Sequence, residues 1–293
     1  MASLKILKTY KLYIAGQFPR SESGRYYELT DQKGKTLANV SMASRKDFRN
    51  AVVTARAAQT PWQEKSAMNR GQILYRMAEM LQGRDKQFED ELQYMGISKS
   101  RAEEEVELSI DRLVYYAGAC DKFQQIFSSV NPVASSHYNF SVPEAMGVVA
   151  VIPPENFGLL GTISTIAPII AGANTCVILA PEHLPLASIS FAEVLAHSDL
   201  PAGVVNILSG DIDELHGHFS SHMDVNAMLY CGKNKKHLKA MQENSSLNVK
   251  RFFHWDLDWE EEEAQSPYLI MDFQEIKTTW HPIEKTGVSG IKY

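Results

Sequence analysis

The fold of this chain is decided by residues 147–186, which read GVVAVIPPENFGLLGTISTIAPIIAGANTCVILAPEHLPL, and by LPAGVVNILSGD at 200–211. Short runs that are apolar at every position alternate here with helix-length segments. Such strands are buried on both faces, so the pattern predicts an α/β fold with a Rossmann-like parallel sheet covered by helices. Five strands are expected, at 147–152, 175–179, 204–208, 227–230 and 249–253.

The front third of the chain is predicted to be mostly helical, after short strands around the turn at 33–34. Ser44 and Asp47 form a variant of the capping box and predict a helix start. A second helix is expected to end near Gly83, and Ser100 with Glu103 predicts the start of a third, long helix.

Two β elements are expected outside the parallel sheet. Residues 128–143 are polar and β-prone, with a break at 131–132, and predict a hairpin that protrudes from the core. A final strand is expected from Tyr268 onward, through FQEIKTTWHP at 273–282.

Composition excludes several classes of function. The net charge of the 293 residues is −6, which argues against a nucleic-acid partner. There is no run of about 18 apolar residues, so no membrane span is expected. The three cysteines, Cys120, Cys176 and Cys231, are far apart and without metal-binding spacing. They favour buried thiols in a reducing compartment, and the cytoplasm is the expected location.

The stretch 147–211 resembles the aldehyde dehydrogenase superfamily. The family's corresponding motifs have the forms GVVxxIxPWNFP, AGNTVVxKPxExxPL and LPxGVxNVVxG. The opening YKLYIAGQF at 10–18 and the closing FQEIKTTWHP are also similar to that family. The resemblance therefore covers most of the chain and implies the family's NAD(P)-binding fold.

The resemblance also implies roles for individual residues. Asn156 falls where the family's asparagine donates to the substrate oxyanion; the alternative is that its amide holds the Pro-Pro turn. Glu182 falls near the ribose hydroxyls, or is a solvated loop carboxylate. Gly210 corresponds to a glycine of the adenine pocket. Gly232 corresponds to the glycine that opens the helix under the diphosphate. Pro154 and Lys233 complete the set of expected cofactor-binding residues.

Several positions depart from the family pattern. The tryptophan before the oxyanion asparagine is Glu155 here, and the ribose-binding lysine is Leu179 or, with a one-residue shift, Ala180. The second glycine of the diphosphate turn is His237, and the serine after the first is Lys233. Binding of NAD or NADP is therefore possible but doubtful.

The family's catalytic machinery has no counterpart in the sequence. No cysteine follows Cys231, and residues 253–258 hold no general-base glutamate with a glycine pair. Residues 256–267 are too few for a catalytic domain, because an independent domain needs about 50 residues. The chain is therefore expected to be a truncated member of the family.

The expected organisation has three parts. Residues 1–127 and 147–255 form a nucleotide-binding domain, and 128–146 with 267–293 form an oligomerisation hairpin and tail strand. Residues 256–266 form an acidic connector that replaces the catalytic domain.

No metal site is predicted. The acidic run within 256–263 lacks the spacing of a calcium loop and is expected to be solvated. Among His216, His218 and His222, at most two share a helix face, without a third ligand, so surface histidines are expected. Cys231 is expected to be a buried thiol rather than a reactive one.

Three hypotheses of function remain open. The first is a non-catalytic subunit that assembles with itself or with a full-length aldehyde dehydrogenase. The second is one component of a composite NAD(P)-dependent oxidoreductase, and the third is a nucleotide-binding sensor.

Overall fold

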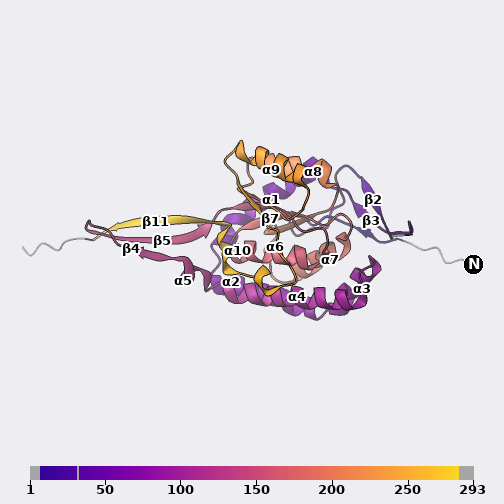
Figure 1. Ribbon diagram of the computed structural model, residues 1–293, viewed down its shortest axis with the longest axis horizontal. Helices are drawn as coiled ribbons and strands as arrows, with labels where there is room; N and C mark the ends of the chain where they lie inside the picture. The colour runs from indigo at the N-terminus through magenta and orange to yellow at the C-terminus, as the bar shows by residue number, and fades with distance from the viewer. Residues whose placement is uncertain (1–6, 32, 284–293) are drawn as a thin grey trace, which may run out of the picture.

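A computed structural model describes residues 7–31 and 33–283 of the chain. Figure 1 shows a helix-covered body from which a narrow β-sheet protrudes. The elements, in chain order, are β1 (Thr9–Tyr10), β2 (Tyr26–Thr30), β3 (Thr36–Ser41), α1 (Arg45–Gln63), α2 (Ala67–Gln82), α3 (Asp85–Tyr94), α4 (Lys99–Ala119), α5 (Phe123–Phe127), β4 (Ser129–Asn131), β5 (His137–Ala145), β6 (Val148–Ile152), α6 (Leu160–Ala171), β7 (Thr175–Leu179), α7 (Pro185–His197), β8 (Val205–Leu208), α8 (Ile212–Ser221), β9 (Ala227–Tyr230), α9 (Lys235–Ser246), β10 (Arg251–His254), the short 3-10 helix η1 (Glu262–Ala264), α10 (Pro267–Met271) and β11 (Gln274–Pro282).

The central sheet confirms the predicted fold class. Its five strands lie in the order β10-β9-β6-β7-β8, and every neighbouring pair is parallel. All residues of β6, β7, β8 and β9 are buried, which explains why these strands are apolar on both faces. The order reverses direction after β8, so the carboxyl ends of β6 and β9 lie next to each other at the crossover.

Two layers of helices cover this sheet (Figure 1). Helices α1, α8 and α9 lie on one face, and α6 and α7 lie on the other with α2, α3 and α4 behind them. Each face has its own apolar core, in which alternate residues of one strand take part: Val149 and Val151 belong to one core, and Val148 and Ala150 to the other.

The helix starts were predicted with mixed success. The capping box of α1 is confirmed, because the Ser44 hydroxyl accepts from the Asp47 amide while the Asp47 carboxylate accepts from the Ser44 amide. Helix α2 ends at Gly83 as predicted. The predicted start of the long helix at Ser100 is wrong, because Ser98 is the N-cap of α4. Helix α3 was missed, since its ten residues are mostly polar.

The protruding sheet consists of β4, β5 and β11, in the order β11-β5-β4 (Figure 1). The predicted hairpin is confirmed as the antiparallel pair β4–β5. The final strand was placed too early, because Pro267–Met271 is a helix whose Tyr268 amide bonds to the Ser266 hydroxyl. Residues 284–293 of the expected tail lie outside the described residues.

The connector between β10 and α10 packs against helix α4. The carboxylates in it are exposed as expected, but Trp259 and Ala264 are buried in the main core. The buried guanidinium of Arg112 donates to the carbonyl oxygens of Trp259 (3.1 Å) and Glu261 (2.6 Å). The connector is therefore held in place by its backbone and is not a loose solvated loop.

In the part of the chain that the structure describes, no helix has the length and apolar character needed to cross a membrane.

Candidate functional site

Two adjoining pockets open at the carboxyl ends of β6 and β9, where ligands bind in open parallel sheets. Both are lined by Glu155, Gly232 and Lys233. The helix-side pocket also includes Glu182, His183, Ile212 and His237 and lies at the start of α9. The connector-side pocket also includes Pro154, Asn156, Cys231, Asp256 and Trp259.

Five of the six expected cofactor-binding residues therefore line this cleft: Pro154, Asn156, Glu182, Gly232 and Lys233. Gly210 lines neither pocket. Its φ of +152° and the closeness of Ala43 and Leu215 to any added Cβ give it a backbone role at the end of β8.

Asn156 is exposed at the floor of the turn after β6. Within the described residues its amide makes no hydrogen bond to the turn, so it does not hold the Pro-Pro turn as one expectation had it. The side chain is instead available to a molecule in the connector-side pocket.

The turn after β9 differs from a phosphate-binding turn. The expectation that Gly232 opens the helix is wrong, because α9 begins at Lys235 and Asn234 is its N-cap. The Asn234 side chain accepts from the amides of Lys236 (2.9 Å) and His237 (3.4 Å), so two amides at this helix end are already satisfied.

Sequence reasoning missed the part that Tyr230 takes in this turn. A Cβ on Gly232 would lie 2.5 Å from the Tyr230 hydroxyl, which also accepts from the Asn234 amide at 3.2 Å. The buried tyrosine ring thus packs directly against the backbone of Gly232. The sequence signal for this contact was that Tyr230, a bulky residue at the end of a predicted strand, stands two positions before Gly232.

The cleft carries more negative than positive charge. The Glu155 carboxylate accepts from the Glu182 amide at 2.9 Å. Burial raises the pKa of Glu155, although the hydrogen bond from the Glu182 amide opposes this rise. Burial, and then the charge of Asp211, raises the pKa of Glu182. Lys233 lies 3.8 Å from Asp256 and is almost fully exposed, so it offers little to a ligand inside the cleft. These residues do not fit the diphosphate of a dinucleotide.

We predict that replacing Glu155 by glutamine will stabilise the protein in a pH-dependent way. The pKa of Glu155 is raised in the folded state above its ordinary value of 4.5. At pH values just above 4.5, the folded protein therefore holds this proton while the unfolded chain has lost it. The wild-type free energy of unfolding should therefore fall as pH rises from about 4.5 through the raised folded pKa. Glutamine keeps an acceptor oxygen for the Glu182 amide but cannot ionise, so its contribution to stability does not change with pH in this way.

Urea unfolding at several pH values tests this prediction. The Glu155→Gln variant should be more stable than the wild type near neutral pH, and the gap should close towards pH 4.5. A gap of equal size at all pH values would show that ionisation of Glu155 is not the cause.

The cleft holds one thiol, that of Cys231. It is 4% exposed, and burial raises its pKa well above the ordinary value. Cys120 and Cys176 are buried in the core. As expected, Cys231 is therefore a protonated, buried thiol rather than a thiolate.

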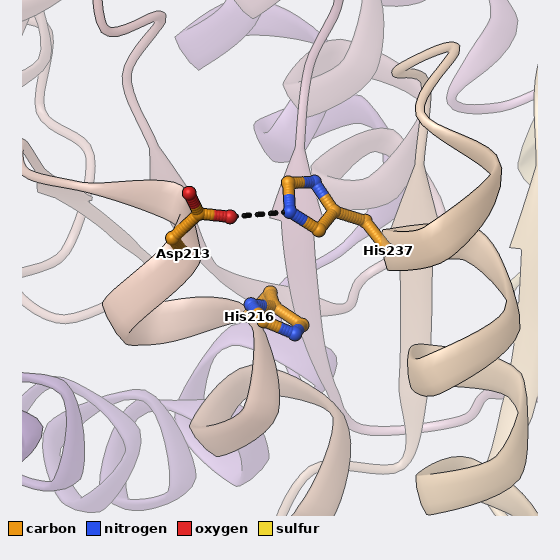
Figure 2. A group of neighbouring side chains, drawn as sticks. All are labelled: Asp213, His216 and His237. Atoms are coloured by element: carbon orange, nitrogen blue, oxygen red, sulfur yellow. Dashed lines mark hydrogen bonds and ion pairs between the residues drawn. The ribbon is translucent and has the colours of Figure 1, made fainter.

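The histidines of α8 do not lie as the sequence suggested. His218 and His222 lie apart from the pockets, and the His222 ring packs against Phe48. His216 instead lies near Asp213 and His237, as Figure 2 shows. The expectation that His216 lacks further possible ligands is wrong. The i,i+3 spacing of Asp213 and His216 was a usable signal, whereas His237 joins them only through the packing of α9 on α8.

Comparison with known proteins shows which family this chain is similar to. The model of the aldehyde dehydrogenase family matches residues 18–255. Omega-crystallin of Enteroctopus dofleini is 29% identical over 84% of this chain and 50% of its own length. The human mitochondrial 10-formyltetrahydrofolate dehydrogenase is 27% identical over 83% of this chain and 27% of its own.

Solved structures agree with the sequence relatives. PnpE from Pseudomonas sp. WBC-3 has a TM-score of 0.80 and 26% identity, covering 85% of this chain and 50% of that one. The NAD+ complex of aldehyde dehydrogenase from Bacillus cereus has the same TM-score at 24% identity, over 84% and 50% of the two chains. The chain thus spans half, or less, of the length of the relatives it matches.

Proposed function

Because the chain belongs to the aldehyde dehydrogenase family, we propose that it is a non-catalytic member that acts as an assembly or partner subunit. Its partner is either a second copy or a full-length aldehyde dehydrogenase, and neither a nucleic acid nor a membrane. The buried thiols accord with a reducing cytoplasm.

The observation that carries this proposal is the protruding sheet. Strand β11 pairs with β5 along its whole length, from Gln274 opposite Ala145 to Pro282 opposite His137. Within the described residues, the outer edges of β11 and β4 pair with no further strand. A long free edge is a ready template for another strand, and proteins seldom leave one uncovered.

The side chains of this sheet support the same conclusion. Large apolar residues are about half exposed or more on all three strands, although each is of a type that normally lies inside. They are Val130 (64%), Tyr138 (46%), Ile276 (54%) and Trp280 (57%). Burial against a partner would remove this apolar surface from water.

We predict that the double variant Ile276→Lys/Trp280→Lys will weaken assembly by at least about 100-fold, since each lost apolar contact contributes about 1.5–3 kcal/mol. Size-exclusion chromatography with light scattering measures this, for the chain alone and mixed with a full-length aldehyde dehydrogenase. Met68→Lys is the matched control, because Met68 is 72% exposed and lies on α2, outside the three strands of the sheet.

The proposal fails if the wild-type chain is a monomer that does not bind a full-length family member. It also fails if Met68→Lys weakens assembly as much as the double variant, because the sheet would then not be the interface.

One observation favours a composite enzyme as the second candidate. Asn156, at the family's oxyanion position, is exposed in the connector-side pocket. There its amide is available to donate to the substrate oxyanion that forms when a partner's thiolate attacks an aldehyde. Such an enzyme would use NAD or NADP. The carboxylates of the cleft, and the amides of α9 that already bond to Asn234, disfavour binding of the cofactor's diphosphate. The same features count against a nucleotide-binding sensor.

A further inference from the structure

Three side chains that commonly bind metals meet where α8 packs on α9. Asp213 and His216 are three residues apart on α8, so they lie on one face of that helix. His237 lies in the first turn of α9. Figure 2 shows the Asp213 carboxylate facing the His237 ring, with the His216 ring next to this pair.

We propose that Asp213, His216 and His237 form a binding site for a divalent transition-metal cation of the zinc type. One ligand atom from each residue lies within 4.8 Å of the other two. Ligand atoms around a tetrahedral zinc ion are roughly 3.3 Å apart, given bonds of about 2.0–2.1 Å. The Asp213 side chain is 78% exposed, so its carboxylate is free to adjust its distance from the two imidazoles.

The tautomer of His216 suits this role. Its Nδ1 atom donates to the carbonyl oxygen of Ile212, at 2.9 Å. This bond leaves the lone pair of Nε2 free and fixes the ring, as the second hydrogen bond of a metal-binding histidine usually does. The sequence alone offered no such orienting group.

His237 is held towards the same point. Its Nε2 atom lies 2.6 Å from Oδ1 of Asp213, and its side chain is only 12% exposed. The two imidazole rings are 4.8 Å apart at an angle of 31°. A cation bound to both rings would take one lone pair from each neutral imidazole.

The ligand set selects the kind of ion. Two imidazoles and one carboxylate suit Zn²⁺, Co²⁺, Ni²⁺ or Cu²⁺ better than Mg²⁺ or Ca²⁺, which prefer oxygen. Three protein ligands leave a fourth position for water or an anion. Because His237 lines the helix-side pocket, the ion would place positive charge beside Glu182 and Glu155.

Calorimetry with ZnCl₂ alone on the untagged, metal-stripped full chain tests the proposal. We expect one ion per chain with a dissociation constant on the order of 1 μM or below. His216→Ala and His237→Ala should each weaken binding at least tenfold. His218→Ala is the matched control on the same helix and should change affinity less than twofold.

A second readout guards against misfolded variants. Zn²⁺ should raise the Tm of the wild type and of His218→Ala, but not that of Asp213→Asn, which keeps the shape of the side chain. The proposal is overturned if the wild type binds Zn²⁺ no tighter than about 100 μM. It is equally overturned if His237→Ala and His218→Ala bind Zn²⁺ alike, which would leave Asp213 and His237 as a hydrogen-bonded pair without a metal.

Discussion

Incubated with an aldehyde and NAD+, the purified chain is expected to form NADH at no more than about 10⁻⁶ of the rate of a full-length aldehyde dehydrogenase. Loss of a nucleophile and its base as a unit costs an enzyme a factor on this order. The one thiol in the cleft, Cys231, is buried and has a raised pKa. NADH absorbance measures the rate.

The Cys231→Ser variant is the control for this assay. Turnover by the wild type that disappears in Cys231→Ser would make Cys231 a nucleophile and contradict the non-catalytic assignment. A rate that appears only after a full-length family member is added, and exceeds that member's own rate, would favour the composite enzyme.

Replacing Glu105 by alanine is expected to lower the free energy of unfolding by about 3 kcal/mol, because it leaves two buried amides without a partner. Glu105 is a residue of α4, but its carboxylate accepts from the amides of Leu159 (2.6 Å) and Leu160 (3.1 Å) at the start of α6. Helix α6 has no capping side chain of its own. Burial raises the pKa of Glu105, so the carboxylate is costly to bury and these bonds offset that cost.

Urea unfolding measures this loss, with Glu105→Gln as the matched variant. Glutamine keeps an acceptor oxygen of similar reach, so it should lose only about 1 kcal/mol. Hydrogen exchange in Glu105→Ala should also quicken at the first turn of α6. Equal losses in the two variants would show that charge, rather than the acceptor, is what α6 requires.

The parallel sheet could be predicted closely because strands buried on both faces appear in the sequence as short runs that are apolar at every position. The strands at 175–179 and 227–230 lie where the apolar runs placed them, as β7 and β9. Most expected site residues also meet at one cleft, since they follow strands whose carboxyl ends are neighbours.

Other features depend on contacts that leave little trace in local sequence. Helix α3 buries few apolar residues, Phe88 and Leu92, so its periodicity is weak. Gly232 was expected to open a helix, but α9 begins only at Lys235 and the Tyr230 ring packs against Gly232. The acidic connector was expected to be solvated because the groups that hold it are distant in sequence. Arg112 belongs to α4, and Trp259 is buried in the main core.

The sequence by itself determined the family, the parallel sheet and the absence of a cysteine beyond Cys231, because these follow from local patterns of apolar and reactive residues. Only the tertiary structure decided that Glu105 caps α6 and that His237 joins Asp213 and His216. Both pairings join different elements. Their geometry is set by how helices pack on the sheet, which no spacing along the chain encodes.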